Sequence, residues 1–230
     1  MIYVMSDIHG CDARYRDILR QIKLKSTDHL YILGDVIDRF PSGIGILRET
    51  MKKENITLLM GNHEHMMLEA LTHPDDADAR HLWYTNGGRI THAHFKHCSH
   101  AYRAEVLDYI RSLPVEIELT VADKQYLLVH GAPTATFSEG SRHTNSTKHA
   151  VWTRLGRNTP LLNDKRSSLG ICPHTITHSI FRCPYGMAEI RSALTVAVLG
   201  VRKADLAACG WMICESSTLK KECSVCSNTH

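Results

Sequence analysis

Short apolar runs that alternate with helix-like segments limit this chain to a narrow set of folds. The runs at 2–6, 29–34 and 56–61 have the length and apolar character of buried strands. The segments between them, 12–24 and 42–54, carry the apolar spacing of helices. This β-α-β-α-β order predicts a parallel sheet that is covered by helices.

The second half of the chain has a different pattern of apolar and polar residues. Residues 64–71 and 102–112 have the spacing of two further helices. The span 115–131 is typical of two strands joined by a short hairpin at Ala122-Asp123-Lys124. The span 134–149 is rich in Ser, Thr, His and Gly and predicts a long loop, and such loops in compact domains are usually functional or disordered.

The composition is that of an ordinary globular protein, apart from an unusually high histidine content. The 230 residues suit one sizeable domain, and a net charge of +3 is too small to indicate a nucleic acid or an anionic membrane as partner. We see no signal sequence and no apolar run of about 20 residues, so we expect no membrane span. Only two of eight cysteines precede residue 172, which favours a reduced, cytoplasmic protein. Histidine, with 16 copies, is the commonest metal ligand.

Polar side chains follow each apolar run at the point where the run ends. The first three runs lead into "SDIHG", "GDVIDR" and "GNHE", and two later runs end at His130 in "LLVHGA" and His174 in "CPHT". Each piece alone has a structural explanation, such as a turn or a core histidine. Because open α/β sheets place active sites at the carboxyl ends of their strands, the shared context favours one site built from five strand ends.

This ordered set of motifs resembles the calcineurin-like metallophosphoesterases, in the branch of the bacterial and phage-type Ser/Thr phosphoprotein phosphatases. The matching motifs are "DIHG", "GDVIDR", "GNHE", "VHGA" and "HT", in the family's order over residues 1 to about 180. Lesser matches fall at "WYTNGG" (83–88) and "VWTR" (151–154). The resemblance implies an α/β fold, a four-layer α/β/β/α sandwich, for the domain at residues 1–190.

The resemblance also implies two divalent metal ions as cofactors. The first would be held by Asp7, His9 and Asp35, and the second by Asp35, Asn62, His130 and His174, so that Asp35 bridges them. Oxygen and imidazole ligands suit Mn²⁺, which we expect first, and also Fe or Zn²⁺. The ions bring more positive charge than the two aspartates cancel, so the site attracts a phosphate dianion.

Four more residues receive catalytic roles from the resemblance. His63 would be the general acid that protonates the departing alkoxide, and Asp38 would orient it. Arg39 and Arg154 would hold the phosphate oxygens, because a guanidinium matches their geometry. A hydroxide shared by the two ions would be the nucleophile.

The implied function is hydrolysis of phosphate monoesters, with phosphoserine or phosphothreonine in proteins as the substrate. Ile176 stands where many phosphodiesterase members have a metal-binding histidine, which favours the phosphatase branch. Pro173 replaces the glycine that the family has before the histidine of this motif. A dinucleoside polyphosphate hydrolase and a non-catalytic metal-binding scaffold remain alternatives, although a scaffold has no use for His63, Asp38 and Arg39.

Two other clusters of potential metal ligands lack the spacing of a metal site. The histidine run at 91–100 follows "NGG", and we expect a solvated helix or a substrate-side loop there. Four cysteines near the C-terminus are spaced C-x₄-C-x₈-C-x₂-C, which fits no common zinc motif; they are Cys209, Cys214, Cys223 and Cys226.

Residues 191–230 form an atypical tail. Six of the eight cysteines lie at or after residue 172, and little of the tail has the apolar periodicity of a helix or a strand. If the reading frame is shifted by two bases, codons permitted for residues 194–219 can encode the D-C-G and G-R-L sequences. These sequences are typical of the final strands of the sheet in this phosphatase branch. The hypothesis is that a frameshift near 186–193 costs the sheet its final strands.

Overall fold

The computed structural model describes residues 1–121, 124–153, 167–170, 179–183, 186–190 and 195–199. The strands are β1 (Ile2–Ser6), β2 (His29–Ile32), β3 (Ile56–Leu58), β4 (Glu116–Val121), β5 (Lys124–Val129), β6 (Ser167–Gly170), β7 (Ser179–Cys183), β8 (Gly186–Ile190) and β9 (Thr195–Leu199). The helices are α1 (Asp12–Ile22), α2 (Gly43–Lys52), α3 (Asn62–Thr72), α4 (Ala77–Trp83), α5 (Arg89–Phe95), α6 (His100–Ser112) and α7 (Ser146–Trp152). A π-helical segment, η1 (Tyr84–Gly88), and a 3₁₀ turn, η2 (Thr134–Thr136), complete the set.

The first sheet has the strand order β3-β2-β1-β9. Strand β1 pairs with β2 in parallel, with Ile2 opposite His29, and β2 pairs with β3 in parallel, with Leu30 opposite Ile56. The β-α-β-α-β order of the sequence is therefore confirmed as a parallel sheet. Strand β9 pairs with β1 antiparallel, with Ile2 opposite Leu199.

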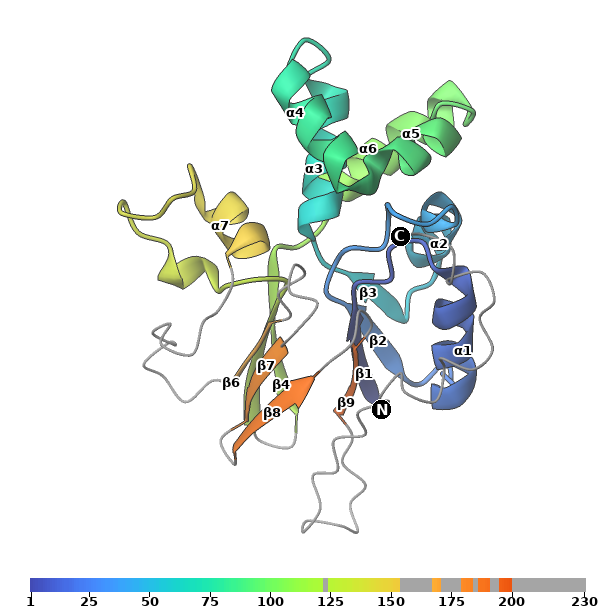
Figure 1. The fold of residues 1–230 in the computed structure, drawn as a ribbon. Coiled ribbons are helices and arrows are strands. Elements are labelled where there is room, and N and C mark those ends of the chain that lie inside the picture. The colour runs from blue at the N-terminus through green and yellow to red at the C-terminus, as the bar shows by residue number, and fades with distance from the viewer. Residues whose placement is uncertain (122–123, 154–166, 171–178, 184–185, 191–194, 200–230) are drawn as a thin grey trace.

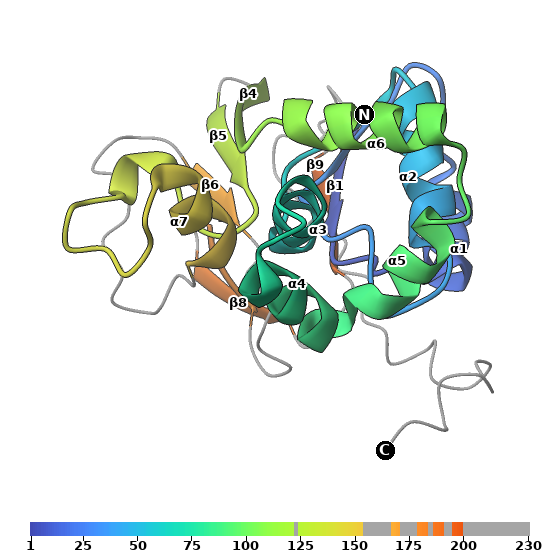
Figure 2. The same cartoon turned by 90° about the horizontal axis from the view of Figure 1, so that it is seen from above.

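The second sheet has the order β4-β5-β6, and β7 and β8 form a separate pair. Strands β4 and β5 are the antiparallel partners expected from the hairpin pattern. Figure 1 shows this sheet beside the first. In Figures 1 and 2, α1 and α2 lie outside the first sheet, and Figure 1 shows α7 above one end of the second. The predicted α/β sandwich is confirmed.

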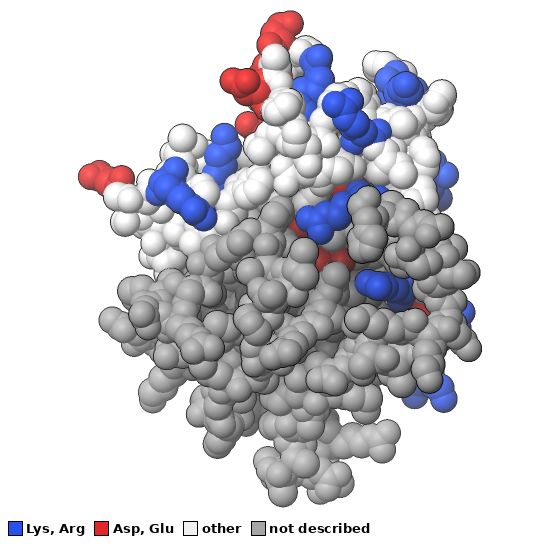
Figure 3. Space-filling view, in the orientation of Figure 1, with Lys and Arg blue, Asp and Glu red and all other residues white. Residues whose placement is uncertain are grey.

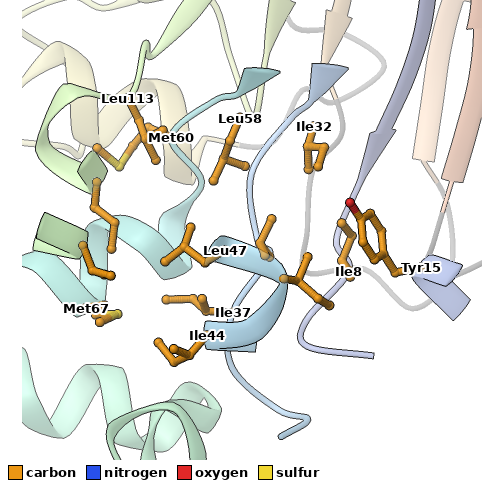
Figure 4. Packing of buried hydrophobic residues seen from close by; sticks show 14 of the residues in the cluster. Ile8, Tyr15, Ile32, Ile37, Ile44, Leu47, Leu58, Met60, Met67 and Leu113 are labelled. Atoms are coloured by element: carbon orange, nitrogen blue, oxygen red, sulfur yellow. The ribbon is translucent and has the colours of Figure 1, made fainter. Parts of the chain in front are cut away.

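Side chains alternate along β1 between two apolar cores. Tyr3 and Met5 belong to the larger core, which the first sheet shares with the helices, and Val4 belongs to a smaller core with Leu33 and Leu128. Figure 4 shows part of the larger core. Because the strand is buried on both faces, its sequence is a continuous apolar run rather than an alternating one.

Helices α3 to α6 lie above the ends of β1, β2 and β3 (Figure 1). This helical layer includes the histidine run, part of which forms α5. His94 Nδ1 lies 2.7 Å from the backbone oxygen of Pro41, and His92 Nδ1 lies 2.5 Å from the Tyr84 hydroxyl. The run therefore contributes to packing above the sheet, as a helix with exposed and half-buried histidines.

The prediction of a long loop at 134–149 is wrong at its C-terminal end, because α7 begins at Ser146. The Asn145 side chain caps this helix by accepting the backbone N–H of Lys148 at 2.7 Å. An asparagine before a short polar helix resembles a turn in the sequence, which explains the error.

Strand β9 lies within the segment 191–230 that the sequence marks as an atypical tail. The other residues of that tail, including the four C-terminal cysteines, lie outside the described residues. Within the described part of the chain, no helix combines the length and the apolar character that crossing a bilayer requires.

Candidate functional site

Backbone hydrogen bonds join the loop after β1 to the loop after β2. The N–H of Asp7 donates to Gly34 O at 3.3 Å, and the N–H of His9 donates to Asp35 O at 2.8 Å. A third bond runs from Gly10 N to Val36 O at 2.6 Å. The two loops therefore continue side by side beyond the sheet, and they bring Asp7 and His9 next to Asp35.

The predicted site residues have an unusual backbone conformation. Six described residues other than glycine have a positive φ, and five of the six belong to the predicted site. They are Asp7, His9, Asp35, Asp38 and Arg39, with φ between 48° and 71°. Aspartate and histidine tolerate this region better than most residues, and strained backbone concentrates at functional sites.

The loop after β3 brings the start of α3 against the same place. Gly61 precedes α3, and a Cβ at Gly61 would collide with Asp35 Oδ1. The absence of a side chain at Gly61 lets the helix approach closely, and the N–H of His63 donates to Asp35 Oδ1 at 3.1 Å.

The two carboxylate oxygens of Asp35 face two different groups of side chains. Asp35 Oδ2 lies 3.7 Å from His9 Nε2, and that nitrogen lies 3.7 Å from Asp7 Oδ1. Asp35 Oδ1 lies 3.6 Å from His130 Nε2, and that nitrogen lies 3.0 Å from Asn62 Oδ1. Ligands about 2.0–2.2 Å from one ion stand about 3–4 Å apart, and each of these four distances falls in that range.

Hydrogen bonds determine which nitrogen of each histidine faces Asp35. His9 Nδ1 donates to Ile37 O at 3.1 Å, and His130 Nδ1 donates to Leu33 O at 2.5 Å. Each Nε2 is then left with a lone pair that points at the carboxylate. Outer hydrogen bonds of this kind orient metal-bound histidines in proteins.

The donor set fits a positively charged ligand. Asp7 Oδ2, His9 Nε2 and Asp35 Oδ2 are buried and have no hydrogen-bond partner among the described residues. Burial raises the pKa of Asp35 well above its usual value. Burial also acts to raise the pKa of Asp7, but the nearby His9 and His130 lower it overall. Buried acceptors without donors are costly, and a cation would satisfy all of them.

His63 lies beside this group and has different partners. Its Nδ1 donates to Asp38 Oδ2 at 2.6 Å, and its Nε2 lies 3.3 Å from Arg39 Nη2 and 3.8 Å from Asp35 Oδ2. Burial, together with the charges of His9, Arg39 and His130, lowers the pKa of His63 well below its usual value. Burial raises the pKa of Asp38 to about 7.

Among the described residues, His9, Asp35 and His63 each offer one potential ligand atom, and these three atoms lie within 4.8 Å of one another. Figure 3 shows Asp and Glu side chains recessed near the centre of one face, with Lys or Arg side chains beside them. The structure thus brings together eight of the ten site residues predicted from the sequence. The other two, Arg154 and His174, lie outside the described residues.

Two buried residues that the sequence did not single out support this site. The Glu64 carboxylate accepts the backbone N–H groups of Asp35 and Val36 at 2.7 and 2.8 Å. The indole of Trp83 donates to the carboxylate of Asp38. Both residues stand in motifs of the sequence, "GNHE" and "WYTNGG", but nothing in the motifs indicates these contacts.

Comparison with known proteins assigns the chain to a family. The family model "Calcineurin-like phosphoesterase" matches residues 1–192. A relative from Salmonella typhimurium, named serine/threonine-protein phosphatase 1, is 26% identical over 205 residues, which cover 86% of this chain and 88% of the relative. A relative from Wigglesworthia glossinidia brevipalpis, named bis(5'-nucleosyl)-tetraphosphatase, symmetrical, is 38% identical over 68 residues, 29% of this chain and 25% of the relative.

A solved structure described as a cold-active protein tyrosine phosphatase has a similar fold. The TM-score is 0.50 at 16% sequence identity, with 85% of this chain and 73% of the other chain covered. The family model spans most of the chain, and the fold and the ordered motifs agree with it. This chain belongs to the calcineurin-like phosphoesterases.

Proposed function

We propose that this chain hydrolyses phosphate monoesters at a dinuclear metal centre, with phosphoserine or phosphothreonine in proteins as the substrate. The family uses a dinuclear metal centre. The observation that carries the proposal is the position of Asp35, whose two oxygens face two separate groups of potential ligands. A single carboxylate between two such groups is suited to bridging two ions.

Six residues would hold the ions. One ion would be bound by Asp7, His9 and Asp35, and the other by Asp35, Asn62, His130 and, from outside the described residues, His174. The oxygen and imidazole donors suit Mn²⁺, and Fe or Zn²⁺ would also be accepted. When bound, the two ions supply a nucleophile from water at neutral pH and offset the charge of the phosphoester.

His63 would deliver the proton that the leaving group needs. As the P–O bond to the alcohol breaks, the leaving oxygen gains charge, and a proton from His63 Nε2 would neutralise it. The 2.6 Å hydrogen bond from Nδ1 to Asp38 makes Nε2, which lies 3.3 Å from Arg39 Nη2, the ring nitrogen that would carry the transferred proton. The Asp38 carboxylate beside Nδ1 supplies the negative charge that favours the protonated ring.

Arg39 would bind the phosphate oxygens. Its guanidinium lies 3.3 Å from His63 Nε2, so a phosphate held by Arg39 would place its leaving oxygen near the proton donor. Arg154, which lies outside the described residues, would also hold the phosphate. A planar guanidinium can donate two parallel hydrogen bonds to phosphate oxygens, which fixes orientation as well as charge.

The choice of a phosphoprotein substrate rests on the relative named serine/threonine-protein phosphatase 1, which this chain matches over 88% of its length. The relative named bis(5'-nucleosyl)-tetraphosphatase supports a second candidate, hydrolysis of dinucleoside polyphosphates, over a much shorter match. The third possibility is a metal-binding scaffold without turnover, and an assay must distinguish it from the two hydrolases.

One set of assays tests the proposal. The metal-free protein receives Mn²⁺ and is given p-nitrophenyl phosphate, a phosphoserine peptide or diadenosine tetraphosphate. We expect Mn²⁺-dependent turnover of the first two substrates, with a higher kcat/KM for the peptide than for the dinucleotide. Preference for the dinucleotide would support the second candidate. Binding of Mn²⁺ without turnover of any substrate would leave a scaffold and contradict the proposal.

A further inference from the structure

The indole of Trp83 contacts the same carboxylate that holds His63. Trp83 Nε1 donates to Asp38 Oδ1 at 3.2 Å and to Asp38 Oδ2 at 3.0 Å. Asp38 Oδ2 also accepts the 2.6 Å hydrogen bond from His63 Nδ1. Both side chains of the bond between Trp83 and Asp38 are fully buried, so water does not compete for it.

The position of the indole depends on the chain around it. The exposed fraction of Trp83 is 0%, and its ring packs near His92, with 5.5 Å between ring centroids. A Cβ at Gly88 would collide with Trp83 Nε1, so the polar edge of the indole fits only because Gly88 has no side chain. The indole is thus confined to the orientation in which its N–H reaches Asp38.

The segment that carries Trp83 supports the loop after β2 at two further points. The N–H of Asp38 donates to Thr91 Oγ1 at 2.9 Å, and the N–H of Arg39 donates to Gly87 O at 3.2 Å. Asp38 and Arg39 both have a positive φ, with values of 71° and 65°. Contacts from outside the loop stabilise that strained conformation, and the segment 83–91 supplies them.

We propose that Trp83 is a positioning residue, which acts through Asp38 to hold His63 in the orientation that delivers a proton to the leaving group. Without the indole, the carboxylate would lose the donor that lies within reach of both its oxygens and could rotate, and the imidazole would rotate with it. The N–H of Trp83 spans both carboxylate oxygens and blocks that rotation. This inference rests on the proposed function, because it assigns Trp83 to the proton donor of that reaction.

The test is a double-mutant cycle with Trp83→Phe and His63→Asn in the Mn²⁺-loaded protein. Phenylalanine keeps a buried ring but removes the N–H. Because a hydrogen bond to a charged group is lost, we expect kcat for a phosphoserine peptide to fall about 10- to 100-fold. The KM and the metal content should stay at their wild-type values. For p-nitrophenyl phosphate, whose leaving group needs little protonation, the loss should be much smaller.

The effect should vanish when His63 is absent. In the His63→Asn background, Trp83→Phe should change kcat by less than about twofold, because the two residues act as one unit. Tyr84→Phe is the matched control, since it removes a hydroxyl bonded to His92 in the same aromatic cluster without touching Asp38. That variant should retain wild-type kcat.

Two results would overturn the inference. One is a Trp83→Phe loss of equal size for the peptide and for p-nitrophenyl phosphate, and the other is a loss of equal size with and without His63. If Trp83→Phe does not fold, Gly88→Ala replaces it, because the new methyl group displaces the indole and the same outcomes apply. The single variant His63→Asn tests whether His63 is the proton donor. A failure of the proposed function is therefore distinguished from a failure of the role proposed for Trp83.

Discussion

The carboxylate of Glu64, in the first turn of α3, accepts the backbone N–H of Asp35 at 2.7 Å. It also accepts the N–H of Val36 at 2.8 Å and that of Gly61 at 3.2 Å. Glu64 is fully buried, and backbone donors from two loops satisfy its charge. The position of Asp35 therefore depends on a side chain that lies outside the proposed set of ligands.

Replacing Glu64 by Gln should loosen the site without removing a ligand. One carboxylate oxygen becomes an NH₂ group, which faces backbone N–H donors and leaves at least one of them unsatisfied. We expect the free energy of unfolding to fall by about 1–3 kcal/mol and Mn²⁺ to bind more weakly. Urea unfolding and a Mn²⁺ titration measure the two effects.

Glu69→Gln is the control for that substitution, because Glu69 lies on the same helix and approaches Lys148 on the surface, at 3.7 Å. A surface pair of this kind contributes little to stability. Equal unfolding midpoints and equal Mn²⁺ affinities for Glu64→Gln and Glu69→Gln would contradict the role of Glu64.

The bridging role of Asp35 can be read from thermal stability as well as from turnover. A ligand that binds only the folded state raises the melting temperature, so Mn²⁺ should stabilise the metal-free protein. In Asp35→Asn we expect this shift to disappear, together with turnover, because the amide removes the charge shared by both ions.

Calorimetry or fluorescence melting with and without Mn²⁺ measures the shift. Asp17→Asn changes an aspartate on α1 that pairs with Arg20 near the surface, and it should keep both the shift and the activity. Two bound ions and full turnover in Asp35→Asn would remove the bridging assignment.

Substitution of His63 separates a proton donor from a metal ligand. We expect His63→Asn to keep its metal content and to lose about 10²- to 10⁴-fold in kcat for a phosphoserine peptide. The loss should be smaller for p-nitrophenyl phosphate. A variant that binds one ion fewer would show that His63 is a ligand, in line with its 3.8 Å distance from Asp35. Exposed His73→Asn controls for the loss of a histidine elsewhere.

Much of this site could be located from the sequence because its residues follow buried strands. The apolar runs before Asp7, Asp35 and Asn62 predict parallel strands, and parallel strands end at one edge of a sheet. The structure has these strands in the predicted order. The motif order then identified the family, which the family model bears out over residues 1–192.

The supporting residues could not be located in this way, because their contacts join distant parts of the chain. Trp83 lies 45 residues from Asp38, and Glu64 lies 29 residues from Asp35. Periodicity indicates which face of an element is buried but not which atom it meets there. Helix α7 was missed for a related reason, since its seven residues are too few for a period to stand out.

A frameshift near residues 186–193 would change the strand that pairs with β1. Strand β1 is central in the first sheet and pairs with β2 on one side. On its other side it pairs with β9, a five-residue strand that begins at Thr195, beyond the proposed shift. Among the described strands, β9 is the edge of this sheet, and an edge strand offers unpaired backbone groups to other chains.

If the reading frame is shifted, restoring it should replace β9 with the final strands that are typical of this phosphatase branch. We expect the frame-restored protein to melt at a higher temperature, to aggregate less and to turn over p-nitrophenyl phosphate faster. The described residues of the proposed site, from Asp7 to His130, precede the shift, so Mn²⁺ should bind both forms. Re-sequencing of the gene and parallel melting curves decide the matter. A nucleotide sequence that cannot encode D-C-G and G-R-L in the second frame, or a restored protein that melts no higher, would refute the hypothesis.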